Sequence, residues 1–258
     1  MVAEERQMQI CDLLSARNAV QIGELAAQFQ VSAETIRRDL LALEQQGLLR
    51  RTHGGAVSLS RMAHVKNYAQ RQEEFQLQKQ ELAQTALSMI QDGDTITLDS
   101  GTTATQLARL LPGRFRELTV ITYAMDVAQE LKNAPGIHLI LTGGYYLAEE
   151  NACWGDFSLS VLQRLHADKA FLCPSAVSLS GGITDYSYQL LPLQKAFLGM
   201  ADRVFILADS SKFEKTARLQ IAALSPEHTL ITDSALSLDI CALYRKKSLS
   251  ILRGKTQK

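Results

Sequence analysis

The sequence predicts an α/β protein of two domains, in which a small helical domain ending in a β-hairpin precedes a larger domain built around a mostly parallel sheet. Three observations support this prediction. The length of 258 residues is enough for one small and one ordinary-sized domain. Residues 20–57 contain two helical patterns followed by a hairpin pattern. From Thr95 onward, short apolar runs alternate with helical segments, as in a sheet covered on both faces.

Two helices joined by a tight turn are predicted in the first domain, at about residues 20–39. Apolar residues recur at helical spacing over 22–29, which indicates a short amphipathic helix. Ser32 stands at the N-cap position of a second helix over 33–46. Gly47 is expected to end that helix, because its last turn favours a residue with positive φ. The residues expected to be buried are Ile22, Leu25, Ala26, Phe29, Ile36, Leu40 and Leu43.

A β-hairpin is predicted directly after the second helix. Residues 48–51 form one strand, 53–55 the turn and 56–58 the return strand. Helix, turn, helix and hairpin together make a winged helix-turn-helix. An exposed Arg-Arg pair is usually only a solvated surface, but here it coincides with the helix spacing, the serine cap and a second arginine pair. Arginines on this helix suit the phosphates and guanine edges of a major groove. The candidate DNA-binding residues are Ser32, Glu34, Thr35, Arg37, Arg38, Arg50, Arg51 and His53.

The remainder of the first domain gives a weaker signal. A helix over 3–17 is expected to pack beneath the other two, with 18–21 as a connection. Residues 1–57 carry six Lys/Arg and seven Asp/Glu, and the whole chain has no net charge. The basic signal is therefore local, and a double-stranded DNA operator would meet a small patch. Two copies of that patch in a homo-oligomer would raise the affinity.

Composition places the chain in the cytoplasm. The four cysteines are scattered without a CxxC motif, so we expect neither a metal site nor a disulfide framework. The N-terminus lacks the apolar segment of a signal peptide, and no stretch approaches the ~20 apolar residues that cross a membrane. These features predict a cytoplasmic protein with no membrane partner.

The second domain is expected to be an open, Rossmann-like α/β domain. The predicted domains are 1–58 and 76–258, with a polar linker over 59–75 and a helix over 76–90. The following strands alternate with helices, which favours parallel pairing. The predicted strands are 95–98, 118–122, 137–141, 169–172, 204–208, 230–232 and 250–252. The predicted helices are 103–111, 125–132, 157–165, 190–200 and 236–245.

Three loops at predicted strand ends carry polar groups, at 99–103, 142–144 and 208–213. Ligands of open α/β sheets lie beyond the carboxyl ends of the strands, and helix N-termini bind anions. Each loop alone is also an ordinary turn or capped helix start, and a lysine on an apolar helix often only extends its ammonium to solvent. Together they predict a site for a small phosphorylated polyol. The candidate effector-binding residues are Asp99, Ser100, Gly101, Thr102, Thr103, Gly143, Gly144, Lys195, Asp209 and Lys212.

The motifs TIRRDL at 35–40 and RTHGGAV at 51–57 resemble the N-terminal domain of the DeoR family of bacterial transcriptional regulators. The second domain resembles the effector domain of that family through DGDTITLDSGTT, LTGG, ADKAF, LADSSKF and LITD, and the similarity covers about 3–235. The resemblance implies a repressor or dual regulator of a carbohydrate operon that responds to a phosphorylated sugar intermediate. It also implies an effector domain with the fold of ribose-5-phosphate isomerase and the CoA transferases, and a homo-oligomer, dimeric or often tetrameric. We expect no cofactor and no catalytic residue.

The chain departs from the family pattern at two loops. Tyr123-Ala124 stands where Asn-Ser is common after the second strand, and the loop that starts at Cys173 lacks the usual Gly and Asp. The anion-binding loops are kept, whereas those that would contact the remainder of the ligand differ. The residues therefore predict a phosphorylated ligand and leave its other part open.

Two further functions remain open. The first is a sugar-phosphate isomerase with a DNA-binding appendage, which needs a carboxylate base near the substrate carbon. The 173–182 loop contains no acid, and Asp99 and Asp209 are expected to orient loops. The second is a plain oligomerisation domain, which would leave the three polar loops without a purpose.

Overall fold

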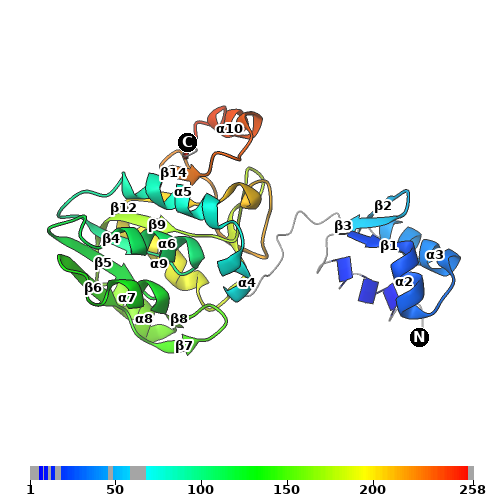
Figure 1. The fold of residues 1–258 in the computed structure, drawn as a ribbon, viewed down its shortest axis with the longest axis horizontal. Helices are drawn as coiled ribbons and strands as arrows, with labels where there is room; N and C mark the ends of the chain where they lie inside the picture. Colours follow the sequence, from blue (N-terminus) through cyan, green and yellow to red (C-terminus); the bar gives the residue numbers. More distant parts are fainter. Residues whose placement is uncertain are drawn as a thin grey trace. The chain divides into compact units, whose positions relative to one another are not determined.

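The computed structural model of the chain describes residues 6–7, 9–10, 13–14, 19–45, 49–58 and 68–254 (Figure 1). The chain divides into two compact units, Met1–His64 and Val65–Lys258. Each unit has its own buried core.

The first unit is a winged helix-turn-helix, as predicted. Its three strands form an antiparallel sheet in the order β1-β3-β2. The apolar stripe of the second helix is buried, with Ile36, Leu40 and Leu43 at most 2% exposed. Ile10 and Leu14, from the described part of the predicted first helix, complete the core. The predicted C-terminal Gly47 lies outside the described residues. The elements are β1 (Ala19–Gln21), α2 (Ile22–Phe29), α3 (Ala33–Gln45), β2 (Leu49–Thr52) and β3 (Gly55–Ser58).

The segment 18–21 was expected to be a connection, but its described part is strand β1. This strand pairs with β3, and Val20 lies opposite Ala56. A Cβ atom at Gly55 would collide with the backbone of Val20, so the third strand requires glycine there. Three residues are too few to show an alternating pattern, so no strand could be predicted there.

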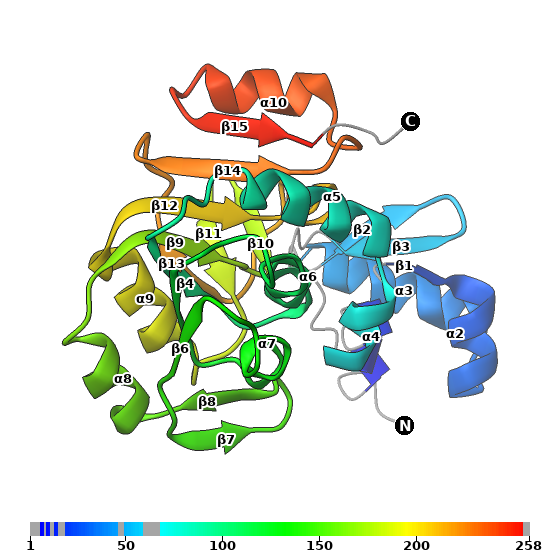
Figure 2. The ribbon, with the colours of Figure 1, turned by 60° about the vertical axis from the view of Figure 1, so that its left-hand side comes forward.

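The second unit contains the predicted parallel sheet. Seven strands pair in the order β15-β14-β12-β9-β4-β5-β6, and every pair is parallel. Figure 2 shows β15, β14 and β12 side by side in this order. From β4 the strand order runs through β5 to β6 at one edge of the sheet, and from β9 it runs through β12 and β14 to β15 at the other edge. The strand order therefore reverses between β4 and β9. The sheet strands are β4 (Thr95–Leu98), β5 (Leu118–Thr122), β6 (Ile137–Leu141), β9 (Ala167–Leu172), β12 (Ala201–Leu207), β14 (His228–Thr232) and β15 (Ser250–Arg253).

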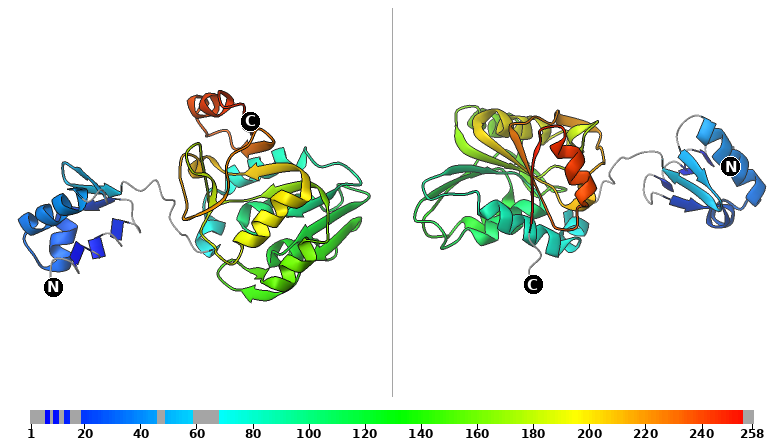
Figure 3. Two further views of the ribbon diagram at one scale, coloured as in Figure 1. Left: turned by 180° about the vertical axis from the view of Figure 1, so that it is seen from behind. Right: turned by 90° about the horizontal axis from the view of Figure 1, so that it is seen from above.

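Helices cover both faces of this sheet, which explains its continuous apolar strands. Helices α5, α6 and α7 lie on one face, and α8 and α9 lie on the other (Figures 1 and 3). Each face has its own apolar cluster. The helices of this unit are α4 (Tyr68–Glu73), α5 (Gln76–Leu87), α6 (Thr102–Leu110), α7 (Met125–Leu131), α8 (Asp156–Leu162), α9 (Leu191–Met200) and α10 (Leu238–Arg245), with a 3-10 turn, η1 (Ser210–Lys212).

Four features of the second unit differ from the sequence-based expectation. Helix α4 lies within the predicted linker 59–75, of which 68–75 are described. A hairpin, β7–β8, and a small antiparallel sheet, β10-β11-β13, occupy segments expected to be loops. The predicted helix 76–90 ends at Leu87. Helix α4 and the added strands are too short to show a period, and tertiary contacts stabilise them. The added strands are β7 (Tyr145–Leu147), β8 (Ala152–Trp154), β10 (Ala176–Ser178), β11 (Gly182–Asp185) and β13 (Leu219–Ala222).

Candidate functional sites

Helix α3 begins with a side-chain cap. The Ser32 hydroxyl accepts a hydrogen bond from the backbone N–H of Thr35, at 3.1 Å, as the predicted N-cap requires. The two hydroxyls also lie 2.9 Å apart and share a hydrogen bond. Both candidate residues therefore lie together at the exposed start of the helix.

The outer face of α3 presents two arginines to solvent. Arg37 and Arg38 are exposed, on the side opposite the buried stripe. The guanidinium of Arg37 is 3.1 Å from the carboxylate of Glu34. Arg38 forms no hydrogen bond or ion pair with another described residue. Its five N–H donors are therefore available to a ligand of this surface.

A buried ion pair that the sequence analysis did not identify fixes α3 from below. Arg6 Nε donates to Asp39 Oδ2 at 2.6 Å, and Arg6 Nη2 donates to Asp39 Oδ1 at 3.2 Å. Both residues are at most 6% exposed. The hydrogen bond to Asp39 raises the pKa of Arg6, although burial opposes it. This fork fixes the rotation of α3 about its axis, and hence the direction in which its arginines point.

The wing is attached to α3 through Arg51. The backbone N–H and the Nε of Arg51 donate to the Glu44 carboxylate at 2.8 and 2.9 Å. These two hydrogen bonds, the backbone one first, lower the pKa of Glu44. His53 is exposed in the turn between β2 and β3. The side chain of Arg50 lies outside the described part of the chain.

In the second unit, the reversal of strand order brings the ends of β4 and β9 together. Asp99, directly after β4, accepts hydrogen bonds from the backbone N–H of Ser100 at 2.7 Å and of Cys173, directly after β9, at 2.8 Å. The hydroxyl of Tyr123, after β5, donates to the same carboxylate. In doubly wound sheets, this reversal point is where ligands bind.

Asp99 orients this loop from a buried position. Its carboxyl group is 0% exposed, and burial raises its pKa to about 6 while the hydrogen bond from Tyr123 opposes the shift. Tyr123 stands where the family pattern has asparagine, and burial raises the pKa of its hydroxyl.

The start of α6 offers donors to an anion. Gly101 has φ of 111° and ψ of 164°, a conformation that favours glycine, and the helix has no side-chain cap. A Cβ atom at Gly101 would meet no heavy atom within 4 Å, so the space beside it is open. Ser100 and Thr103 beside it are buried. Uncapped N–H groups at a helix N-terminus bind anions.

The loop after β12 contributes a lysine at the same edge. Lys212 Nζ donates to the carbonyl oxygen of Pro174, in the loop after β9, at 2.8 Å. Asp209 is 1% exposed and accepts from the backbone N–H of Ser211 at 3.0 Å. The predicted loops 99–103 and 208–213 therefore both border the loop that follows β9.

Three predicted residues lie elsewhere. Gly143 and Gly144 follow β6, the edge strand, which is separated from β4 by β5. The Ser158 hydroxyl donates to the carbonyl oxygen of Gly143, and a Cβ atom at Gly144 would collide with Ser158 and Trp154. Close packing therefore accounts for Gly144. Lys195 is exposed on α9, and no interaction within the described part of the chain joins it to the other loops.

Sequence reasoning missed Lys79, which is 4% exposed on α5. Its Nζ donates to the carbonyl oxygens of Glu74, at 2.7 Å, and of Arg71. Burial lowers the pKa of Lys79 to about 8, and the charge of Lys212 adds to this effect. The sequence did contain a signal, because Lys79 shares a helical face with Leu82, Ala83 and Ala86.

Asp185 was also missed, because it lies just beyond the 173–182 loop in which an acid was expected for an enzyme. It is the last residue of β11 and accepts hydrogen bonds from Ser175 Oγ at 2.8 Å, Tyr186 N at 2.6 Å and Gln194 Nε2 at 2.9 Å. Its charge is close enough to contribute to the raised pKa of Asp99. These three acids, Asp99, Asp185 and Asp209, are all buried, as is Asp233 directly after β14.

Comparison with protein families identifies both units. A model described as the DeoR-like helix-turn-helix domain matches residues 6–62, and one described as the DeoR C-terminal sensor domain matches residues 74–234. The chain belongs to the DeoR family. The predicted combination of a helix-turn-helix domain and a sensor domain in a transcriptional regulator is thereby confirmed.

Curated DeoR-type relatives match along most of their length. An uncharacterised HTH-type transcriptional regulator, YulB, of Bacillus subtilis is 36% identical over 96% of this chain and 95% of its own. The L-fucose operon activator of Haemophilus influenzae is 36% identical over 83% and 85%. The lactose phosphotransferase system repressor of Lactococcus lactis is 35% identical over 92% and 93%. A solved ribose 5-phosphate isomerase A from Methanocaldococcus jannaschii is 20% identical over 52% of this chain and 53% of its own, with a TM-score of 0.39.

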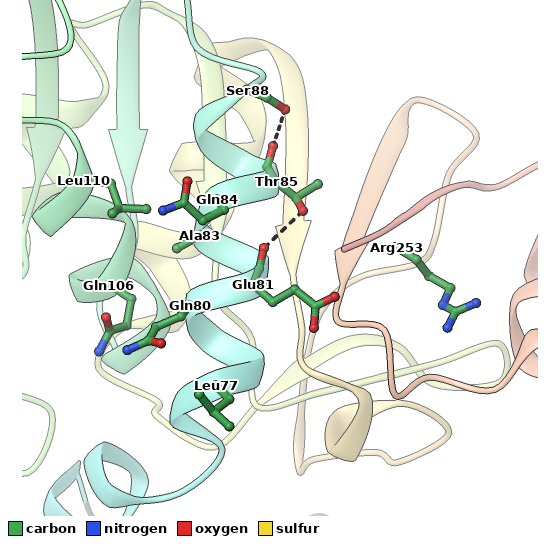
Figure 4. Close-up of a pocket in the computed structure, with 10 residues that line it drawn as sticks. All are labelled: Leu77, Gln80, Glu81, Ala83, Gln84, Thr85, Ser88, Gln106, Leu110 and Arg253. Carbon is green, nitrogen blue, oxygen red and sulfur yellow. Dashed lines mark hydrogen bonds between the residues drawn. The ribbon is translucent and has the colours of Figure 1, made fainter. Parts of the chain in front are cut away.

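A groove of about 760 Å³ lies elsewhere on the sensor unit of this DeoR-family chain, along α5 and α6 (Figure 4). Its lining is mainly amide and aliphatic. Within it, the carboxylate of Glu81 accepts from the backbone N–H and the hydroxyl of Ser234, both at 3.1 Å. The groove does not include the strand-end loops, so its size alone does not make it the candidate site.

Membrane-spanning and metal-binding features are absent from the described ranges. Within them, no helix is long and apolar enough to cross a bilayer. No group of three or more His, Cys, Asp or Glu side chains in the same ranges is placed to hold a metal ion.

Proposed function

We propose that this DeoR-family protein represses a carbohydrate-metabolism operon and is released from its operator by a small phosphorylated sugar or sugar acid. The relatives named for lactose and L-fucose systems support the carbohydrate assignment. One of them is named a repressor and the other an activator, so the sign of regulation requires its own measurement. A reporter gene behind the regulated promoter, in cells with and without the regulator, gives that sign.

We propose that the outer face of α3 reads the operator. The observation that carries this assignment is the exposed Arg38, which has no described partner on a helix fixed from below by Arg6 and Asp39. Arginine can bind guanine through two parallel hydrogen bonds. Ser32, Glu34, Thr35 and Arg37 complete the surface, and Arg50, Arg51 and His53 place the wing against the DNA backbone.

We propose that the phosphate of the effector binds at the uncapped start of α6. Gly101, Thr102 and Thr103 supply backbone N–H groups there, Ser100 supplies a hydroxyl, and Lys212 supplies the charge. Asp99 and Asp209 hold the two loops. The close packing of Gly144, the hydrogen bond from Ser158 to the carbonyl oxygen of Gly143 and the exposure of Lys195 support leaving these three residues out of the proposed site.

The effector assignment is tested by DNA release. Operator DNA is selected from a random duplex library with the wild-type protein, and its affinity is measured with and without sugar phosphates and phosphorylated sugar acids. Lys212→Ala is expected to bind the operator and to remain bound when the effector is added. The matched control, Lys195→Ala, should respond like the wild type. If no phosphorylated compound alters wild-type affinity, or if Lys212→Ala responds normally, the site is misassigned.

We propose that the sensor unit senses and does not catalyse. The three acids at the carboxyl edge accept hydrogen bonds from neighbouring residues, which supports an orienting role over a free general base. Incubation with ribose 5-phosphate and other aldose phosphates is expected to give no ketose phosphate. Isomer formation that Asp185→Asn abolishes would favour the enzyme.

We also propose that the protein binds DNA as a dimer or tetramer. The first domain carries no excess of positive charge, so a single patch offers little electrostatic affinity. Two patches on two half-sites multiply their affinities. Light scattering of the purified protein measures its oligomeric state. Titration of DNA that carries one or two half-sites measures how many protomers bind. A monomer that binds one half-site with full affinity would contradict this proposal.

A further inference from the structure

Helix α4 lies over the start of α6. It follows residues 59–67, which link it in sequence to the DNA-binding unit. The hydroxyl of Tyr68 on α4 is 3.3 Å from the hydroxyl of Thr105, and Thr105 donates back to the carbonyl oxygen of Gly101. Helix α4 therefore contacts the turn where the proposed phosphate site begins.

Arg71 on α4 has one anionic partner and one unused donor. Its guanidinium pairs with the carboxylate of Glu150, in the turn between β7 and β8. The same guanidinium lies 5.6 Å from the centre of the Tyr68 ring. Its Nε atom is buried and has no hydrogen-bond partner among the described residues. An unsatisfied buried donor costs free energy, so this N–H would gain from an additional acceptor.

The charges around this pair belong to the proposed site. The Nζ of Lys79 donates to the backbone carbonyl of Arg71, and Lys79 is also within electrostatic range of Lys212 and Asp209. Glu150 is in turn within range of Lys212 and Asp185. The Arg71–Glu150 pair is therefore within electrostatic range of both lysines, since Lys79 interacts with Arg71 and Lys212 interacts with Glu150.

We propose that Arg71 is an effector-contacting residue, whose guanidinium exchanges Glu150 for the phosphate of the bound ligand and so makes the position of α4 depend on occupancy. The inference rests on the proposed function of the same site and assigns it a further residue. Arginine suits this exchange because its planar fork binds carboxylate and phosphate in the same geometry. Glu150 then competes with the ligand for Arg71. When the ligand displaces Glu150, α4 moves, and this movement changes the position of the residues that precede α4 in the chain.

The test uses the full-length protein and inorganic phosphate as the probe, with affinity measured by calorimetry. Arg71→Gln should weaken phosphate binding by about tenfold, the effect of losing one charge-assisted hydrogen bond. Glu150→Gln should strengthen it severalfold, because the competing carboxylate is gone. Arg109→Gln removes a comparable ion pair, Arg109–Glu130 at 2.9 Å between α6 and α7, and should leave phosphate affinity unchanged.

The opposite signs of the two variants separate ligand contact from structural support. If Arg71→Gln and Glu150→Gln both weaken phosphate binding, the pair only holds the fold and the inference is wrong. If Arg71→Gln does not fold, Arg71→Lys keeps the charge without the fork and should bind phosphate more weakly than the wild type. In that case an unchanged or lower affinity of Glu150→Gln still overturns the inference.

Failure of the inference and failure of the proposed site give different results. If Lys212→Ala abolishes phosphate binding while Arg71→Gln binds like the Arg109→Gln control, the site stands and Arg71 is not part of it. If the wild type does not bind phosphate, or if Lys212→Ala binds it normally, the proposed site fails and the inference fails with it.

Discussion

The DNA-binding unit presents its candidate residues on its outside, whereas the sensor unit holds most of its candidates inside. Arg37 and Arg38 face solvent on α3, while Asp99 and Asp209 are at most 1% exposed. A duplex brings its own surface to the protein and needs no cavity. A small anion must instead lose water to donors that are already in place. Substitutions in the first unit should therefore change affinity alone, and those in the second should change affinity and stability together.

The buried ion pair between Arg6 and Asp39 is the exception to this contrast. Breaking this pair should give the largest effect of the four predictions. Asp39→Ala removes the carboxylate that accepts the hydrogen bonds of Arg6 Nε and Nη2, and breaking a buried ion pair costs about 3 kcal/mol or more. Unfolding of the first unit in denaturant measures this loss. Glu44→Ala, which removes the solvent-screened partner of Arg51, is the control and should cost much less. Equal losses would mean that burial does not distinguish the two pairs.

The second prediction tests whether the outer face of α3 acts through affinity alone. Arg38→Ala should weaken operator binding by about 2 kcal/mol, which corresponds to the loss of one good base contact. The midpoint of thermal unfolding should not move, because the side chain is exposed. Leu41→Ala removes an exposed side chain from the same face and serves as the control. A gel shift that gives Arg38→Ala wild-type affinity would exclude Arg38 from the interface.

The third prediction concerns the buried charge of the sensor unit. Burial lowers the pKa of Lys79 to about 8. The side chain is therefore charged below that pH and neutral above it. Sulfate affinity should therefore fall as pH rises through about 8, by about tenfold for one lost charge. Sulfate is the suitable probe because its own charge is constant in this range. The effect on stability has the opposite sign, because the cost of burying the ammonium disappears at high pH.

Calorimetry at pH 6.5, 7.5 and 9 provides the measurement for this prediction. Lys79→Met should bind sulfate weakly at every pH, with a flat profile. A wild-type profile that is flat as well would show that Lys79 does not interact with the bound anion.

The smallest effect is expected at the wing. Arg51→Ala should weaken binding to all DNA sequences alike and make the salt dependence of affinity shallower by about one unit, the loss of one phosphate contact. Because Arg51 already pairs with Glu44, its net contribution should be below about 1 kcal/mol. Affinities for the operator and for an unrelated duplex, measured at several salt concentrations, show whether the contribution of Arg51 is independent of sequence. Weakening of the operator alone would assign base reading to the wing.

The sequence predicted the elements whose pattern is local. The strands 95–98, 118–122 and 137–141 have the bounds found in the structure, because continuous apolar runs end at clear turns. The Ser32 cap and the buried stripe of α3 were predicted for the same reason. In each case the signal and the structure occupy the same few residues.

What the sequence missed depends on contacts between distant residues. Strand β1 exists because Val20 meets Ala56, and α4 packs through Tyr68 against Thr105. The candidate site was predicted as three strand ends, but spacing along the chain does not give the strand order. In that order β12 and β6 lie on opposite sides of β4, each separated from it by one strand, so the loop after β6 is farther from the loop after β12 than from the loop after β4.

The strand order also determines when the sensor can form during synthesis. The DNA-binding unit ends at His64 and has its own core, so it can fold while the remainder is still being made. Strand β4 then pairs outward with β5 and β6, and its other edge stays open until β9 emerges. Lys212, the proposed counter-charge, is made later still. A nascent or truncated chain that stops before this residue carries a complete DNA-binding unit but no complete sensor, and no effector can control it.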